Sequence, residues 1–264
     1  MSDAQTVYPE FRWLERGDGE PVVFLHGLMG HMDHWEPTLE ALDRVCRGIA
    51  LSLPILEADL PETSVEEVGR YVVRFLDALD IPKAVIGGNS LGGHVALEMA
   101  LSHRERVSGL ILTGSSGLFE RSFTRGVPHR PTDAYVRQKM EEIFFDPRLV
   151  TPEWVESVRR TVTTPASALR VIRFARAAKR HNLEDRLGSI EAPALLVWGM
   201  DDRITAPEVA DRFHALLPES RLVFLPCCGH APMLERPEAF NEAVTEWLAD
   251  TQDRRGAVLV GGVR

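Results

Sequence analysis

The stretch Gly88-Asn89-Ser90-Leu91-Gly92 constrains this chain more than any other. It follows a short apolar run at residues 84–86 and precedes residues 94–101, whose pattern indicates a helix. A serine at the apex of such a strand-to-helix turn has a strained backbone and projects its hydroxyl from the carboxyl end of a sheet. Glycines on either side are needed because side chains there would strike the neighbouring strand and helix. The pattern predicts a nucleophilic serine, although glycine-rich loops without chemistry also produce it.

Short apolar runs alternate with helical patterns along most of the chain. This alternation is typical of an α/β fold, a mostly parallel β-sheet covered by helices on both faces. Ser64 followed by Glu67 is a capping-box pattern that predicts the start of one helix. The predicted strands are residues 7–14, 21–25, 46–53, 84–86, 107–113, 194–198 and 221–225, and the predicted helices include residues 35–42, 94–101, 206–217 and 237–248.

The alternation stops between residues 114 and 187, where helices are predicted at residues 133–145, 152–161 and 165–180. We interpret residues 114–187 as a helical lid inserted into a core formed by residues 1–113 and 188–250. Residues 251–264 are a C-terminal tail that the pattern does not assign. Side chains that face the site would set substrate choice; the candidates are Met29 and Asn89 beside the predicted turns and Phe144, Phe145, Trp154 and Phe174 in the lid.

Composition limits the classes of partner. The 264 residues include 30 Lys and Arg against 39 Asp and Glu, a net charge of −9, which argues against nucleic acid and against an anionic membrane. No apolar stretch reaches the roughly 20 residues of a transmembrane helix. The sparse cysteines (Cys46, Cys227 and Cys228) form no disulfide framework, and the polar N-terminus has no signal-peptide pattern. We expect a cytoplasmic protein that acts on a small molecule, with its oligomeric state open.

A nucleophilic serine needs a general base, and the base needs a carboxylate that orients it. Two predicted strands in the second half of the chain each end at a candidate partner: Asp201 and Asp202 follow the first, and His230 follows the second. Sheets of this kind bind ligands at the carboxyl ends of their strands. We therefore expect Ser90, His230 and one of the two aspartates to meet there. Taken singly, a loop histidine is usually structural, and an aspartate before a helix is usually an N-cap.

The oxyanion of an acyl intermediate needs two N–H donors. One candidate is the backbone N–H of Leu91, which directly follows Ser90 at the start of its helix. The second is expected from the loop His26-Gly27-Leu28-Met29-Gly30, whose glycines allow close backbone approach, and Leu28 is the candidate. His26 is expected to organise this loop rather than to act on substrate.

Other features favour structural explanations. His31 and His34 lack a third ligand pattern, so no metal is expected, and no cofactor is required. Adjacent cysteines could bond only with strain, so free thiols are predicted at Cys227 and Cys228. We interpret the arginines of the lid as a mostly solvated helix face, and one of these side chains could bind a substrate carboxylate. The arginines are Arg159, Arg160, Arg170, Arg173 and Arg176.

Together the motifs resemble the α/β-hydrolase superfamily over residues 7–248. The resemblance is carried by His26-Gly27-x-x-Gly30, Gly88-x-Ser90-x-Gly92, Trp198-Gly199-x-x-Asp202 and Gly229-His230. It implies the α/β-hydrolase fold with a lid and the serine-nucleophile branch of the superfamily. It also implies a triad in the order Ser90, Asp202, His230. Asp202 is favoured over Asp201 because it lies four residues after the tryptophan of the acid turn.

The stretch from Gly88 to Gly93 and the pair Asp202-Arg203 also resemble the meta-cleavage product hydrolases, which cleave carbon–carbon bonds in aromatic degradation. Those enzymes usually carry a tryptophan directly after the catalytic histidine, and here that position is Ala231. Haloalkane dehalogenases and epoxide hydrolases are similar too, but they use an aspartate nucleophile. We therefore expect a serine hydrolase of small or medium carboxylic esters. The alternatives are carbon–carbon cleavage of a vinylogous keto acid and a non-catalytic small-molecule receptor.

Overall fold

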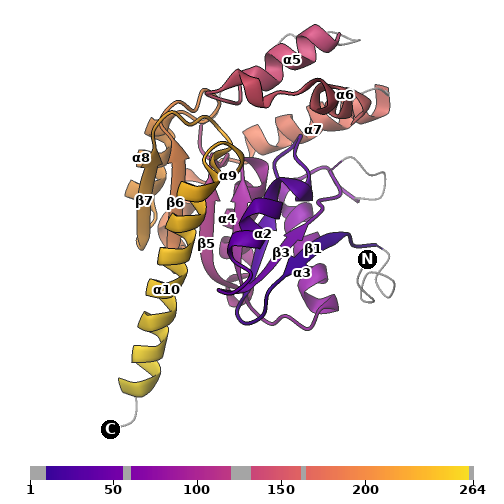
Figure 1. Cartoon of the computed structure of the whole chain (residues 1–264). Coiled ribbons are helices and arrows are strands. Elements are labelled where there is room, and N and C mark those ends of the chain that lie inside the picture. Colours follow the sequence, from indigo (N-terminus) through magenta and orange to yellow (C-terminus); the bar gives the residue numbers. More distant parts are fainter. Residues whose placement is uncertain (1–9, 56–60, 120–131, 162–164, 262–264) are drawn as a thin grey trace.

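The computed structural model describes residues 10–55, 61–119, 132–161 and 165–261. Its centre is a seven-stranded sheet in the order β1-β3-β2-β4-β5-β6-β7 (Figure 1). β1 pairs antiparallel with β3, and every other neighbouring pair is parallel, so the predicted α/β fold is confirmed. The strands are β1 (Trp13–Arg16), β2 (Pro21–Leu25), β3 (Arg47–Leu51), β4 (Ala84–Asn89), β5 (Val107–Thr113), β6 (Ala194–Gly199) and β7 (Ser220–Leu225).

Successive strand side chains enter two separate hydrophobic cores, one on each face of the sheet. In β2, Val23 joins the core that includes residues of α3, α4 and α8, whereas Phe24 joins the core that includes residues of α2 and α10. Burial on both faces explains the continuous apolar runs of the sequence. α3 begins at the predicted cap, where the Ser64 hydroxyl accepts a hydrogen bond from Glu67 N at 3.1 Å. These helices are α2 (Glu36–Ala41), α3 (Val65–Ala78), α4 (Leu91–Ser102), α8 (Pro207–Leu216) and α10 (Pro237–Gly261).

The order of strand addition reverses between β2 and β4. β3 lies on one side of β2, and β4 to β7 follow on the other side. Open α/β sheets bind ligands outside the carboxyl ends of their strands at such a switch point. The loop after β2 begins at His26 and the turn after β4 carries Ser90, so the topology brings these two segments together.

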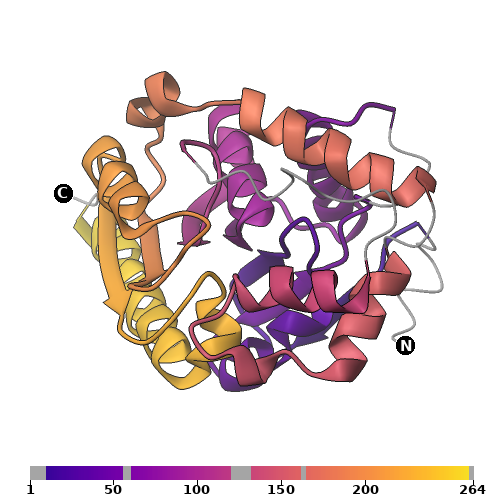
Figure 2. The same cartoon turned by 90° about the horizontal axis from the view of Figure 1, so that it is seen from above.

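Between β5 and β6 the described residues form helices and turns and no strand. Viewed from above, α5, α6 and α7 lie across the carboxyl end of the sheet (Figure 2). α5 ends at Glu141, four residues earlier than predicted, and the chain then turns through a short 3₁₀ segment. The elements are α5 (Asp133–Glu141), η3 (Pro147–Leu149), α6 (Pro152–Thr161), α7 (Pro165–Arg180) and η4 (Glu184–Ser189).

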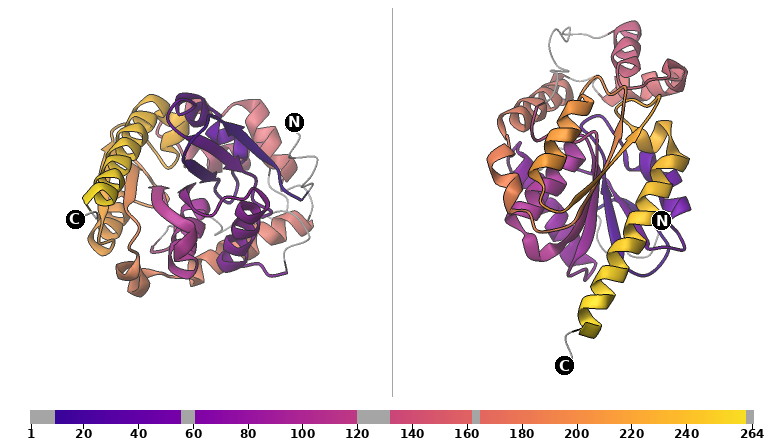
Figure 3. Two further views of the ribbon diagram at one scale, coloured as in Figure 1. Left: turned by 90° about the horizontal axis from the view of Figure 1, so that it is seen from below. Right: turned by 90° about the vertical axis from the view of Figure 1, so that its left-hand side faces the viewer.

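Both ends of the chain differ from the prediction. The first strand begins at Trp13 because it is a short edge strand defined by pairing with β3, and residues 7–9 of the predicted strand lie outside the described residues. α10 continues to Gly261 past the predicted tail boundary, since no proline interrupts it, and it extends beyond the sheet (Figure 3). None of the described helices combines the length and the apolar character that crossing a membrane would require.

Candidate active site

Ser90 occupies the turn between β4 and α4 with a φ of 54° and a ψ of −116°, a conformation that L-residues rarely adopt. Its N–H donates to the carbonyl oxygen of Thr113 at 3.1 Å, so the end of β5 holds the turn. A Cβ on Gly88 would lie 2.2 Å from the carbonyl carbon of Gly92, and a Cβ on Gly92 would lie 2.1 Å from the carbonyl oxygen of Leu25. Both glycines are therefore required by the close approach of helix to strand, as predicted.

His230 and Asp202 are bonded to one another. Nδ1 of His230 lies 2.8 Å from Oδ2 of Asp202, and the two residues are 5% and 4% exposed. The carboxylate also accepts hydrogen bonds from the Thr205 hydroxyl at 2.9 Å and from the N–H groups of Ile204 and Thr205 at 2.8 and 3.0 Å. Asp201 is half-buried, and the structure records no bond between its carboxylate and the ring of His230. A carboxylate held in this way orients the imidazole with Nδ1–H donating and Nε2 left to accept a proton.

The backbone of His230 is fixed from two sides. Its N–H donates to the carbonyl oxygen of Ile143 at 2.7 Å, in the segment after α5. Its carbonyl oxygen accepts from the side-chain amide of Asn89 at 2.9 Å, and the same amide donates to Thr113 at 3.0 Å. Both N–H hydrogens of the Asn89 amide are thus engaged in tying the His230 loop to the ends of β4 and β5. The predicted contact of Asn89 with substrate stays a prediction.

The loop after β2 approaches Ser90 through Gly27, where a Cβ would lie 3.2 Å from Cβ of Ser90. His26 organises this loop, as predicted: its Nδ1 donates to the carbonyl oxygen of Gly27 at 2.8 Å, and its Nε2 accepts from Leu53 N at 2.9 Å. Burial lowers the pKa of His26 from 6.5 to about 4. The ring is therefore neutral and able to donate at one nitrogen while accepting at the other.

The two predicted oxyanion donors lie on the two segments that meet at Ser90. Leu28 follows Gly27 in the loop after β2, and Leu91 is the first residue of α4. The N–H of a first helical residue has no acceptor within its own helix. It also lies at the positive end of the helix dipole, which favours a developing negative charge.

The aromatic residues predicted to line the site differ in exposure. Phe144 and Phe174 are 3% and 2% exposed and belong to the two hydrophobic cores. Trp154 packs against Phe144 and against His34, with ring centroids 5.3 and 5.4 Å apart. Phe145 is 43% exposed. Packing within the hydrophobic cores is enough to explain why the rings of Phe144 and Phe174 are buried. Met29 is half-buried in the loop after β2.

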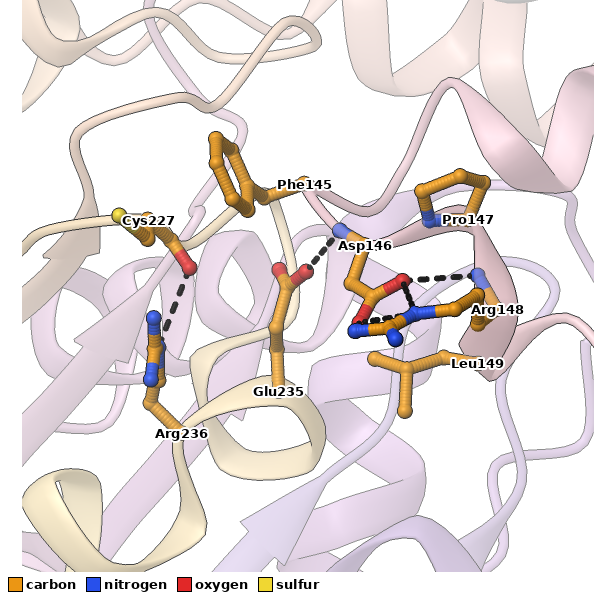
Figure 4. A pocket seen from close by; sticks show the side chains of 8 residues that line it. All are labelled: Phe145, Asp146, Pro147, Arg148, Leu149, Cys227, Glu235 and Arg236. Atoms are coloured by element: carbon orange, nitrogen blue, oxygen red, sulfur yellow. Dashed lines mark hydrogen bonds and ion pairs between the residues drawn. The ribbon is translucent and has the colours of Figure 1, made fainter.

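Glu235, which the sequence analysis did not identify, joins the His230 loop to the segment after α5, and Figure 4 shows its bond to Asp146 in that segment. One of its carboxylate oxygens accepts from Asp146 N at 2.8 Å, and the other accepts from Gly229 N. Thr205 was missed as well. Neither residue carries a recognisable local signal. Glu235 borders a cavity of about 510 Å³, whose lining includes neither Ser90 nor Asp202 nor His230; the lining residues are Phe145, Asp146, Pro147, Arg148, Leu149, Cys227, Glu235 and Arg236.

The remaining candidates have ordinary surroundings. His31 pairs with Asp33 at 2.9 Å, and the described residues contain no cluster of three or more ligating side chains suited to a metal. All three cysteines are free, and burial raises the pKa of Cys228 to about 12. Of the lid arginines, Arg160 pairs with Glu156 at 3.0 Å, and Arg159 pairs with Glu156 and Asp133.

Comparison with known proteins agrees with the geometry. The sequence profile of the Alpha/beta hydrolase family matches residues 22–243. The chain belongs to the α/β hydrolase family. A solved α/β hydrolase enzyme from the metagenome of sediments of the lagoon of Mar Chica, Morocco, is 32% identical, with a TM-score of 0.76 over 92% of this chain and 96% of that one.

Curated relatives carry several activities. The chain is 30% identical to a 2-hydroxy-6-oxononadienedioate/2-hydroxy-6-oxononatrienedioate hydrolase of Cupriavidus pinatubonensis, over 88% of this chain and 87% of that protein. It is 33% identical to the dihydrolipoyllysine-residue acetyltransferase component of the acetoin cleaving system of Pseudomonas putida, over 90% of this chain and 66% of that protein. A thermophilic esterase from Thermogutta terrifontis is 25% identical, with a TM-score of 0.73 over 91% and 93% of the two chains.

Proposed function

We propose that this hydrolase cleaves small or medium carboxylic esters through an acyl-enzyme on Ser90. The observation that carries the proposal is the buried bond between Asp202 and His230 at 2.8 Å. His230 lies on a loop that Asn89 ties to the strand directly before Ser90. Serine activation needs a histidine oriented by a carboxylate, and here that histidine lies on a loop tied to the strand that leads into the strained Ser90.

The reaction proceeds in two halves. Nε2 of His230 takes the proton of the Ser90 hydroxyl while the oxygen attacks the ester carbonyl. The N–H groups of Leu28 and Leu91 stabilise the oxyanion, and Asp202 stabilises the imidazolium that forms. The alcohol leaves with the proton from His230. Water then attacks the acyl-enzyme by the same route and releases the acid and Ser90.

A second candidate is hydrolysis of the carbon–carbon bond of a vinylogous keto acid. The observation that favours it is the 30% identity to hydrolases named for 2-hydroxy-6-oxo dienedioates. Ala231 argues against carbon–carbon bond hydrolysis. It is 4% exposed at the start of α9 (Pro232–Glu235) and occupies the position where the resembled carbon–carbon hydrolases usually carry tryptophan.

The two reactions and the receptor alternative are separated by one assay series. We expect 4-nitrophenyl acetate and butyrate to be hydrolysed, and a 2-hydroxy-6-oxohexa-2,4-dienoate to lose its dienol absorbance more slowly or not at all. Ser90→Ala is the control for both substrates. Faster cleavage of the dienoate would reverse the assignment. If neither substrate is cleaved and a fluorophosphonate does not label Ser90, a receptor would be favoured.

A cytoplasmic location is part of the same proposal, and the three free thiols support it.

A further inference from the structure

Buried polar side chains connect the Ser90 turn to the end of α7. His94, fully buried in the first turn of α4, has Nδ1 3.3 Å from the hydroxyl of Ser116 and Nε2 3.0 Å from Nδ1 of His181. The two imidazole rings also stack, with centroids 5.1 Å apart. Beyond His181, its Nε2 lies 3.4 Å from a carboxylate oxygen of Glu66 and 3.5 Å from one of Glu98. The triad chemistry proposed above uses none of these side chains.

One end of this chain of contacts reaches the backbone of the nucleophile. The carbonyl oxygen of Ser90 accepts hydrogen bonds from His94 N and from Ser116 N, both at 3.1 Å. Because the side chains of those two residues contact each other as well, the three residues close a ring around the Ser90 carbonyl. A displaced His94 ring would therefore disturb the turn that sets the direction of the Ser90 hydroxyl.

The other end lies where α7 returns to the core. His181 directly follows α7, and two residues later Leu183 N donates to the carbonyl oxygen of Gly117 at 2.8 Å. Gly117 lies just after β5, where the chain leaves the sheet toward the helices above it. His181 is thus placed at the joint that fixes the C-terminal end of α7.

The fully buried ring of His94 and the half-buried ring of His181 link their polar neighbours through hydrogen bonds. Burial, helped by the neighbouring His181, lowers the pKa of His94 from 6.5 to about 3, so the ring is neutral and carries one N–H. Glu98, which is 4% exposed and accepts from Arg186 at 3.1 Å, attracts the Nε2–H of His181. The single N–H of His94 lies either at Nε2, where it donates to His181 while Nδ1 accepts from Ser116, or at Nδ1, where it donates to Ser116 while Nε2 accepts from His181. Breaking either bond to His94 leaves a buried ring nitrogen without a partner.

We propose that His94 and His181 are positioning residues that couple α7 to the turn carrying Ser90. The coupling lets the placement of α7 across the carboxyl end of the sheet determine how well Ser90 is aligned. It rests on the proposed role of Ser90 as nucleophile. His94 is fully buried, and His181 contacts His94 and the carboxylates of Glu66 and Glu98. Loss of the coupling should therefore lower kcat, through slower acylation of Ser90, and leave KM almost unchanged.

A double-mutant cycle tests the coupling. His94→Asn keeps a polar atom near the position of Nδ1, which faces Ser116, and removes Nε2, which faces His181. His181→Ala removes the ring that Nε2 of His94 contacts. We expect each variant to lower kcat about tenfold with KM within about twofold, and the double variant to be no slower than the slower single variant. His181→Asn, which restores a polar atom facing His94, should recover most of kcat. His214→Ala, at an exposed histidine of α8, is the matched control and should not change kcat.

Active enzyme is counted by fluorophosphonate titration, so that a poorly folding variant is not mistaken for a slow one. A His181→Ala variant within about twofold of wild-type kcat overturns the coupling, and so does a double variant as slow as the product of the two single effects. In both cases Ser90 of the wild type is still labelled, and the proposed function stands. Absence of labelling in the wild type overturns the nucleophile assignment and the coupling together.

Discussion

Gly114 lies directly against His230: a Cβ at this glycine would be 2.8 Å from Nδ1 and 2.7 Å from the carbonyl oxygen of His230. Gly114 follows β5 with a φ of 53°, in the left-handed region that favours glycine. The missing side chain leaves room for the imidazole between the end of β5 and Asp202. The glycine is therefore as necessary to the placement of the ring as the carboxylate that binds it.

Gly114→Ala should lower kcat about 100-fold or more, because displacing a reacting group by about 1 Å has that effect. Gly19→Ala is the matched control, since Gly19 has a φ of 101° but a Cβ there would meet nothing within 4 Å. Both variants should lose about 1–3 kcal/mol of folding free energy from backbone strain. Only Gly114→Ala should lose turnover in a steady-state ester assay. Equal kcat values in the two variants would show that Gly114 does not position His230.

Ser90→Ala should abolish ester hydrolysis with a loss on the order of 10⁴-fold in kcat, by analogy with other triads. The fold should be unchanged, because alanine and serine tolerate the φ of 54° equally and only the hydroxyl is removed. Single-turnover kinetics and the thermal unfolding midpoint measure the two effects. A variant within about tenfold of wild type would remove Ser90 from the mechanism.

Asp202→Asn should cost about 10³ to 10⁴ in kcat, because an amide that donates to His230 favours the wrong tautomer of the ring. Asp201→Asn should change kcat little, since its carboxylate is half-buried and is not bonded to His230. Assaying the two variants side by side decides between the neighbours. An inactive Asp201→Asn variant together with an active Asp202→Asn variant would contradict the assignment of Asp202 as the residue that orients His230.

Folding stability should fall as the pH drops from 6.5 to 5. Burial lowers the pKa values of His26 and His34 to about 4 and that of His94 to about 3, so in this window the unfolded chain binds protons that the folded chain does not. Each histidine should lower the free energy of unfolding by about 1.4 kcal/mol per pH unit below its unfolded pKa. The contribution is absent above pH 7.

Urea unfolding at several pH values measures this slope. His94→Asn removes one of the three histidine rings whose pKa burial lowers, and it should reduce the slope by about 1.4 kcal/mol per pH unit. A slope that is the same in the variant and the wild type would mean that His94 is protonated in the folded protein.

Phe174→Ala should destabilise the protein by about 3–5 kcal/mol, because the ring is buried in a hydrophobic core and its removal leaves a cavity. Phe145→Ala should have an effect within about 0.5 kcal/mol, since that ring is 43% exposed. Denaturant unfolding compares the two variants. If Phe145→Ala changes the preference for acyl chain length without changing stability, Phe145 remains a candidate for substrate contact.

Local patterns predicted the elements whose signals lie within a few residues. The spans of β2, β5, α6 and α7 were predicted to the residue, and Pro152 and Pro165 marked the starts of the two helices because proline suits the first helical position. β1 and the end of α10 were misplaced. A four-residue edge strand exists only through its pairing with β3, and the end of a long surface helix has no sharp local signal.

The catalytic candidates could be identified from the chain because each follows a strand, and a parallel sheet gathers the residues after its strands at one edge. The particular contacts required the folded molecule. The carboxylate bonded to His230, the use of the Asn89 amide by the backbone and the burial of Phe174 depend on side-chain direction and on packing between distant elements. His94 and His181 are separated by 87 residues, and no local pattern relates them. Sequence periodicity specifies which face of an element is apolar, whereas only tertiary packing brings individual atoms within hydrogen-bonding distance.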